Sequence, residues 1–147
     1  MTHAPAHPRP LAPIEQALSA YFAPWIQAMG LQVVAASADS VTLRLPCDPA
    51  LAREGGMVCG QALMAVADTA KALALVNHFG GFRPCTTVQM NTTFLKPLAG
   101  QDGLVTATVL RAGRSLAFGE IDIRGAADHA CVARASTTYA LLAPPAG

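Results

Sequence analysis

The sequence predicts an α+β fold in which one long buried helix packs against an antiparallel sheet. Residues 58–78 are rich in strong helix formers and are apolar on all sides, which indicates a largely buried helix. Two strand-like segments precede this helix and four follow it. The connections between successive strands are short, and short connections join antiparallel neighbours.

The first element expected is an amphipathic helix over residues 14–29. Pro24 should bend or split it, and Gly30 is a plausible end. Its apolar side carries Ile14, Leu18, Tyr21, Phe22 and Trp25.

Six segments alternate apolar and polar residues as β-strands do. Gly80-Gly81 ends the long helix and separates it from the last four of these strand-like segments. Residues 46–56 between the second strand and the long helix have the composition of a loop. The predicted strands cover residues 31–36, 40–45, 86–95, 104–111, 115–124 and 130–142.

Length and composition restrict the function classes. The 147 residues fit one domain, expected at 14–143 after a proline-containing, disordered tail at 1–13. Apolar residues make up 52% and charged residues 13%, so part of the apolar surface should meet another subunit. The net charge of +1 gives no reason to expect nucleic acid as a partner. The longest apolar stretch, 57–76, contains two charged residues and is not expected to span a membrane.

The four cysteines indicate neither a metal site nor a disulfide framework. No two of them have the C-x-x-C spacing of zinc sites. The N-terminus lacks the apolar core of a signal peptide. We therefore expect free thiols, a cytoplasmic location and no cofactor.

Four motifs in order resemble those of the PaaI-like thioesterases, in the 4-hydroxybenzoyl-CoA thioesterase superfamily. The resemblance covers about residues 30–142. The motifs are GMVCGQALMAVADTA at 56–70, TTVQMNTTFLKP at 86–97, RAGRSLAF at 111–118 and ASTTYA at 135–140. The resemblance implies a hotdog fold, a long helix wrapped by an antiparallel sheet of five to six strands. It also implies hydrolysis of acyl-CoA or aryl-CoA thioesters by a homodimer or a dimer of dimers. Coenzyme A would then be part of the substrate.

Three positions depart from the family pattern. Cys59 stands where the motif usually has His, and Gln61 stands where it has its second Gly. Arg53 occupies a place where related enzymes often carry Asn. These differences concern substrate positioning more than the class of reaction.

Asp68 is the leading catalytic candidate, because it is a lone acid in the most apolar segment of the chain. Burying an unpaired charge is costly and needs a reason. The resemblance assigns Asp68 as nucleophile or as general base toward water. The alternatives are an ion pair with Lys71 at i+3 or an exposed edge of the helix.

The start of the long helix supplies the candidate oxyanion site. Backbone N–H groups of Gly60 and Gln61 would be helix-terminal donors with positive dipole character. The alternative is a glycine that only permits a tight entry into the helix. Cys59 could be a nucleophile, since helix N-termini lower thiol pKa values. No histidine lies near Cys59 in the sequence, so a small buried residue in the substrate site is the preferred interpretation.

The remaining candidates lie at strand ends. The resemblance places the Thr87 hydroxyl near the thioester, with Thr86 and Val88 beside it; the alternative is ordinary β-propensity. Arg111 and Arg114 flank a hairpin and could bind CoA phosphates through forked hydrogen bonds; the alternative is a solvated turn. Gly113 and Ser115 complete this candidate substrate-binding set.

Spacing along the helix predicts that two subunits share each active site. Gly60 and Asp68 are eight residues apart, about 12 Å along the axis. One thioester carbon cannot lie within about 3 Å of both groups. Antiparallel packing of two copies of the helix would bring one copy's Gly60 near the other's Asp68.

Two rival functions stay open. A hotdog hydratase or dehydratase would need a histidine near the acid, and His78 and His129 are distant from Asp68 in the sequence. A non-catalytic acyl-CoA-binding module on the same fold is the second rival. The sequence does not identify the acyl group.

Overall fold

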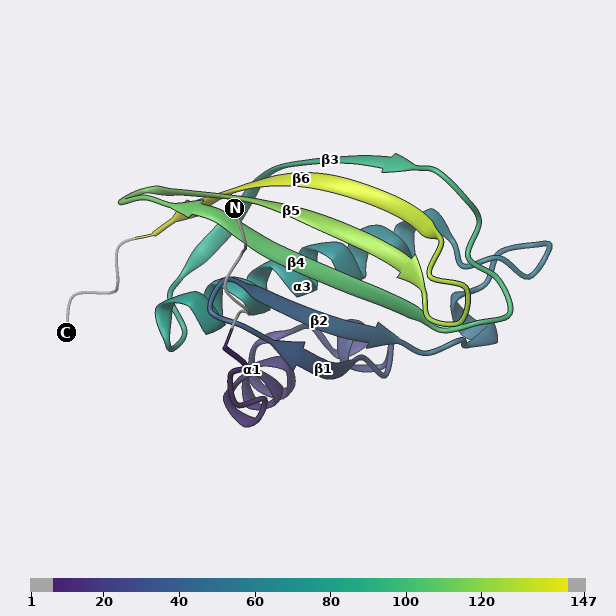
Figure 1. Ribbon diagram of the computed structural model, residues 1–147, viewed down its shortest axis with the longest axis horizontal. Coiled ribbons are helices and arrows are strands. Elements are labelled where there is room, and N and C mark those ends of the chain that lie inside the picture. Colours follow the sequence, from purple (N-terminus) through teal and green to yellow (C-terminus); the bar gives the residue numbers. More distant parts are fainter. Residues whose placement is uncertain (1–6, 143–147) are drawn as a thin grey trace.

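The computed structural model describes residues 7–142, which form one six-stranded antiparallel sheet arched over a long helix (Figure 1). The strand order is β1-β2-β4-β5-β6-β3, so β1 and β3 lie at the two edges. This is the hotdog arrangement that the resemblance to PaaI-like thioesterases implied. The strands are β1 (Gln32–Ala36), β2 (Ser40–Leu45), β3 (Cys85–Phe94), β4 (Gly103–Ala112), β5 (Leu116–Gly125) and β6 (Cys131–Leu141).

The long helix α3 (Gly60–Phe79) supplies much of the core, with most of its side chains buried against the sheet. It begins two residues later than predicted, because the Val58 N–H donates to the Leu98 carbonyl oxygen in an extended bridge. Gly80 ends it in the left-handed conformation, at φ 70°. Within residues 7–142, no helix is long and apolar enough to cross a membrane.

The predicted helix at 14–29 is two helices, α1 (Ala12–Tyr21) and α2 (Pro24–Gln27). Phe22 and Ala23 are extended between them, as expected for residues leading into Pro24. The buried side of α1 includes Ile14 and Ala17, and α1 packs against α3. The link between α1 and α2 therefore lies beside the central helix.

The expected disordered tail at 1–13 is wrong at its C-terminal end. The Arg9 N–H donates to the Ala36 carbonyl oxygen (2.9 Å), and Arg9 Nη1 donates to the Asn77 carbonyl oxygen (3.1 Å). These bonds join the segment before α1 to β1 and to the end of α3, and α1 itself begins at Ala12. Residues 1–6 and the expected domain end at 143 lie outside the described residues.

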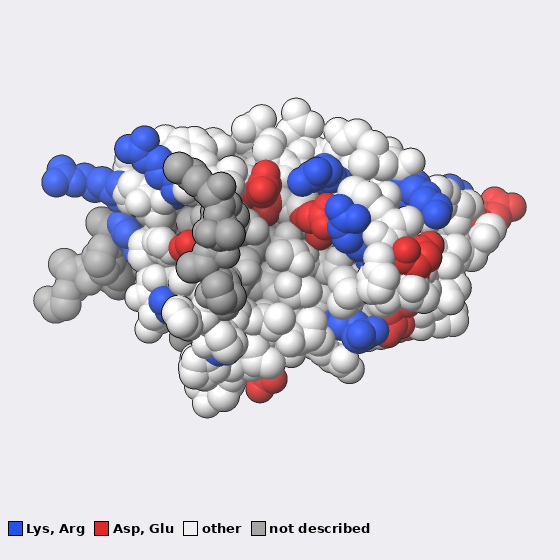
Figure 2. All heavy atoms as spheres, viewed as in Figure 1, with Lys and Arg blue, Asp and Glu red and all other residues white. Residues whose placement is uncertain are grey.

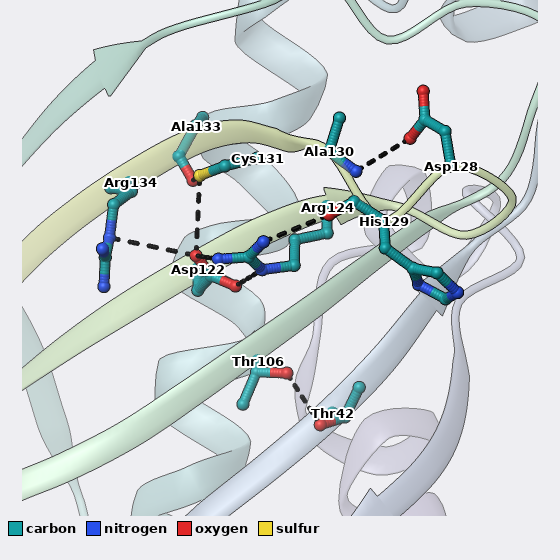
Figure 3. A network of polar contacts seen from close by, with 10 residues as sticks. All are labelled: Thr42, Thr106, Asp122, Arg124, Asp128, His129, Ala130, Cys131, Ala133 and Arg134. Carbon is teal, nitrogen blue, oxygen red and sulfur yellow. Dashed lines mark hydrogen bonds and ion pairs between the residues drawn. The ribbon is translucent and has the colours of Figure 1, made fainter.

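The outer face of the sheet carries a polar network at the ends of β5 and β6 (Figure 3). Arg124 Nε donates to Asp122 Oδ2 at 2.6 Å, and Arg124 Nη1 donates to the His129 carbonyl oxygen at 3.1 Å. Asp128 accepts a hydrogen bond from the Ala130 N–H in the same turn. Acidic and basic side chains are interspersed over the face seen in Figure 2, in keeping with the small net charge.

Candidate active site

The Asp68 carboxylate is held by two hydroxyl groups from the sheet. Thr87 Oγ1, on β3, donates to Asp68 Oδ1 at 2.8 Å. The Tyr139 hydroxyl, on β6, also bonds Oδ1 and lies 2.8 Å from the Asp68 backbone oxygen. Thr87 and Tyr139 are register partners, so adjacent strands present both hydroxyls to α3 together. No ion pair joins Asp68 to Lys71 among the described residues, and that alternative is wrong.

Tyr139 acts as a permanent hydrogen-bond donor to Asp68. Its side chain is buried, and burial raises the pKa of Tyr139 far above its ordinary value. The negative charge of Asp68 and the hydrogen bond to it act in the same direction. Oδ1 is thus occupied by donors, whereas Oδ2 accepts no hydrogen bond from any residue in the range 7–142. The second oxygen remains available to a water molecule or a substrate carbon.

Asp68, Thr69, Thr87 and Tyr139 are polar residues among those that line a pocket of about 320 Å³. The link between α1 and α2 forms its apolar wall, with Tyr21, Phe22, Ala23, Trp25 and Ile26. A pocket of this size lies at the lower end of the range for small-molecule sites. Its mixture of one carboxylate and aromatic walls suits a ligand with a reactive polar end and an apolar body.

Cys85 also lines this pocket, although no motif in the sequence marks its position. Burial raises the pKa of the Cys85 thiol, and the Asp68 charge raises it further, with a smaller opposing effect of Lys71. The thiol form is therefore favoured beside Asp68. The start of β3 gave no sequence signal for this position beyond strand propensity.

Lys71 lies one turn after Asp68, and its ammonium group is fully buried without a hydrogen-bond partner among the described residues. Its Nζ occupies the space that a side chain at Gly119 on β5 would fill. Burial lowers the pKa of Lys71 to about 8, against a smaller opposing effect of Cys85. The side chain points toward the sheet and not toward the carboxylate.

Gly60 lies in a different pocket, of about 350 Å³, with Arg53, Phe94 and Lys96 among its lining residues. The side chain of Cys59, the N-cap residue of α3, makes no capping hydrogen bond within residues 7–142. A Cβ on Gly60 would lie 3.5 Å from the Phe94 ring, an ordinary contact, so packing within the chain does not require glycine here. The structure therefore does not bring Gly60 and Gln61 to Asp68 within one chain.

Cys59, the residue before α3, is half-buried and packs against the hydrophobic core. His78 lies near the opposite end of α3, where its Nδ1 is 3.4 Å from Asp39. The half-buried position of Cys59 fits its preferred interpretation as a small, partly buried residue. His78 is too far along α3 to act as a partner for the Cys59 thiol.

The predicted CoA-binding residues lie at the β4–β5 hairpin, where Arg111, Arg114 and Ser115 are exposed. Arg83 Nη2 donates to the Arg114 carbonyl oxygen at 3.0 Å, which adds a third arginine that the sequence analysis missed. Basic side chains project at this end of the molecule in Figure 2. Thr86 and Val88 are exposed on either side of Thr87 and do not line the Asp68 pocket.

The sequence matches the family model described as Thioesterase superfamily over residues 55–132, slightly more than half of the chain. The chain belongs to the thioesterase superfamily. The matched region contains α3, β3, β4 and β5, and with them Asp68 and Thr87.

Several solved structures have the same fold. Zebrafish thioesterase superfamily member 2 is 25% identical, with a TM-score of 0.82 over 91% of this chain and 99% of that one. A conserved protein of Pseudomonas aeruginosa is 28% identical, with a TM-score of 0.74 over 82% and 95% of the two chains. The Escherichia coli PaaI protein, 18% identical, shares the fold with a TM-score of 0.77 over 90% and 95%.

A curated relative from Thermoplasma acidophilum carries the name of an esterase and is 26% identical over 85 residues. The match spans 58% of this chain and 64% of the length of that relative.

Proposed function

We propose that this protein hydrolyses acyl-CoA or aryl-CoA thioesters to the free acid and CoA. The observation that carries the proposal is the Asp68 carboxylate, which faces an apolar pocket with one oxygen held by Thr87 and Tyr139. A carboxylate fixed by donors on one oxygen can direct the other at a reacting centre. Membership of the thioesterase superfamily supports the reaction class.

In the proposed reaction Asp68 is a general base or a nucleophile. As a base, Oδ2 takes a proton from a water molecule whose oxygen adds to the thioester carbonyl carbon; the C–S bond then breaks and the proton passes to the departing sulfur. As a nucleophile, Oδ2 adds to the thioester carbonyl carbon, the C–S bond breaks and the departing CoA thiolate takes a proton from water; a second water molecule then hydrolyses the acyl–Asp68 anhydride and restores the carboxylate. Label found in the Asp68 side chain after a single turnover in ¹⁸O-water establishes the nucleophilic route, because the general-base route leaves both carboxylate oxygens in place.

The oxyanion donors would come from a second copy of the chain. Gly60 and Asp68 lie about 12 Å apart along α3 and line separate pockets. The edge strand β3 supports a homodimer, because most of its residues are exposed, including the apolar Val88 and Phe94. Pairing two such edges would seat the Gly60 and Gln61 N–H groups of one copy beside the other copy's Asp68. A dimer of dimers is an extension of the same proposal.

In this proposal the CoA phosphates bind at the end of the molecule that carries the β4–β5 hairpin. Arg111 and Arg114 are exposed there, and Arg83 lies against the Arg114 backbone. Guanidinium groups bind phosphates through paired hydrogen bonds. The proposal includes a cytoplasmic location, which the four free thiols support.

A hydratase and a non-catalytic binding module are the alternatives. A hydratase needs a second group that handles a proton, and the residues lining the Asp68 pocket include no histidine. A binding module gives no reason for a carboxylate held by two hydroxyls at the pocket's polar end. Release of CoA thiol from a thioester distinguishes hydrolysis from both.

The test is a hydrolysis panel of short, medium and long acyl-CoAs together with phenylacetyl-, benzoyl- and hydroxybenzoyl-CoA, read as free thiol. Asp68→Asn keeps the shape of the side chain and removes its basicity, so kcat should fall by roughly a thousandfold or more while binding changes little. Cys59→Ser is the matched control and should stay active. An Asp68→Asn variant that retains more than about a tenth of the wild-type kcat would contradict the assignment.

A further inference from the structure

Two cavities meet at the end of α1, and a single residue, Tyr21, lines both. The smaller, of about 320 Å³, holds Asp68. The larger, of about 540 Å³, extends along α1 toward the C-terminal end of α3. Its lining residues include Ile14, Ala17, Ala20, Val76 and Phe82. An apolar space therefore continues beyond the wall of the candidate active site.

An aromatic pair lies where the two cavities adjoin: Tyr21 lines both cavities, and Phe82 lines the larger one. Tyr21 and Phe82 stack with their ring centroids 4.4 Å apart at an interplanar angle of 27°. Tyr21 is the last residue of α1, and Phe82 lies in the connection between α3 and β3. Both side chains are 55% exposed, so neither is needed to fill the core. Their stack forms a partly exposed wall of the larger cavity and contributes little to the packing that holds the fold.

The chemistry of the smaller cavity sets the direction in which a substrate would lie. The carboxylate at its polar end has to meet the thioester, so the acyl or aryl group extends toward the aromatic residues Tyr21, Phe22 and Trp25. A short acyl chain or a single aromatic ring ends at this wall. A longer chain meets the Tyr21–Phe82 stack, beyond which the larger apolar cavity begins.

We propose that the Tyr21–Phe82 stack determines substrate length, so that the enzyme prefers short acyl or aryl thioesters and excludes long acyl chains from the larger cavity. This inference rests on the proposed thioesterase function and on the placement of the acyl group in the Asp68 pocket. Truncating either ring joins the two cavities and admits longer chains.

The experiment compares kcat/KM for butanoyl-, phenylacetyl- and decanoyl-CoA in the wild type, Tyr21→Ala and Phe82→Ala. Each truncation should raise the ratio of decanoyl to butanoyl activity by about tenfold or more, the scale of discrimination by apolar pockets. Phe82→Trp enlarges the wall and should lower the ratio. Phe118→Ala is the matched control, since Phe118 is a partly exposed aromatic residue on the outer face of β5 and should leave the ratio unchanged.

Binding gives a second measurement that does not depend on turnover. Trp25 is the single tryptophan of the sequence and lines the Asp68 pocket, so its fluorescence reports occupancy. Titration with S-butyl- and S-decyl-CoA thioethers, which cannot be hydrolysed, should show tighter binding of the decyl compound once Phe82 is truncated.

The outcomes separate the two proposals. An active wild type whose chain-length ratio stays within about twofold in both truncated variants overturns the length inference and leaves the thioesterase proposal standing. A wild type inactive on every thioester overturns the proposed function. In that case the thioether titrations still test whether the Tyr21–Phe82 stack limits the length of the bound chain. A preference between butyl and decyl thioethers that changes in Phe82→Ala supports this role, and an unchanged preference refutes it.

Discussion

At the residue scale, the position of Asp68 depends on a tyrosine 71 residues later in the chain. Tyr139 is buried, and the raised pKa of its hydroxyl keeps it protonated, so it donates to Asp68 throughout the pH range of ordinary assays. Thr87 supplies the second donor from the neighbouring strand. The bulge at Val88 shifts the register of β3 directly after Thr87, as bulges near active sites often do.

Tyr139→Phe should lower kcat by about ten- to hundredfold with little change in KM, because a hydrogen bond to a charged group contributes about 1.5–3 kcal/mol. The ring stays and preserves the packing, so the change isolates the hydroxyl that positions Asp68. Steady-state kinetics with the best thioester of the panel measures kcat and KM separately and so shows which of the two constants changes.

Thr137→Val is the control for that experiment. Thr137 lies on the same face of β6, buried, and its hydroxyl has no hydrogen-bond partner within residues 7–142. Its loss should leave kcat unchanged. Equal effects of the two substitutions, or a Tyr139→Phe effect on KM alone, would show that Tyr139 does not position the carboxylate.

At the element scale, α3 carries two ionisable residues one turn apart with opposite environments. Asp68 faces the pocket with its donors, whereas Lys71 faces the sheet and packs its Nζ against Gly119. The Lys71 amine is buried without a hydrogen-bond partner within residues 7–142, so its neutral form is favoured in the folded protein. At neutral pH folding must therefore either remove the proton from the amine or bury its charge away from water, and both cost free energy. The helix thus contains a local source of instability beside the candidate catalytic residue Asp68.

Lys71→Met should stabilise the protein at pH 7, because it replaces the buried amine with an apolar side chain of similar length. A pKa lowered from 10.5 to about 8 corresponds to about 3 kcal/mol. Between pH 8 and 10.5 the unfolded wild type binds more protons than the folded one, so wild-type stability rises with pH and the advantage of Lys71→Met shrinks. Urea unfolding at fixed protein concentration over pH 7 to 10.5 measures this.

Lys96→Met provides the comparison, since Lys96 is the only other lysine and is largely exposed. Its effect on the free energy of unfolding should be small and nearly independent of pH over the same window. A Lys71→Met protein that is less stable than the wild type at pH 7 would show that the amine has a partner that stabilises it.

At the scale of the whole molecule, the two halves of the candidate site lie in separate pockets of one chain. Asp68 faces the link between α1 and α2, and Gly60 opens α3 near Phe94. The exposed edge strand β3 offers a surface on which a second copy could pair. A complete site in the proposed homodimer then takes Asp68 from one copy and the α3 N-terminus from the other.

Mixing two inactive variants tests this sharing. Asp68→Asn removes the acid, and Gly60→Pro removes an N–H donor at a helix position where proline is tolerated. After joint unfolding and refolding, about half of the dimers are mixed, and each has one site with both groups intact and one with neither. Thiol release should therefore recover to about a quarter of wild-type activity.

Each variant refolded alone is the baseline for that measurement, and mass spectrometry of the native dimers establishes that mixed dimers form. Mixed dimers with no more activity than the separate variants would refute a shared site and would place the oxyanion donors in the same chain as Asp68.

The sequence by itself determined the elements and the acid. Helix formers, the closing glycine and the alternation of the strands are local signals, so α3 and the six strands appear within about two residues of their predicted bounds. The split between α1 and α2 follows from Pro24 in the same way. Asp68 stood out because an acid in an apolar helix needs a partner.

Only the tertiary structure decided which partner that is. The i+3 spacing favoured Lys71, but the packing of α3 turns Lys71 toward Gly119 and leaves Asp68 to two hydroxyls from β3 and β6. Tyr139 meets Asp68 because of strand register, a bulge and the way the sheet arches over the helix, all of which depend on contacts between residues far apart in the chain. Sequence patterns report on neighbours along the chain, so a site assembled from α1, α3, β3 and β6 becomes visible only once those elements have packed.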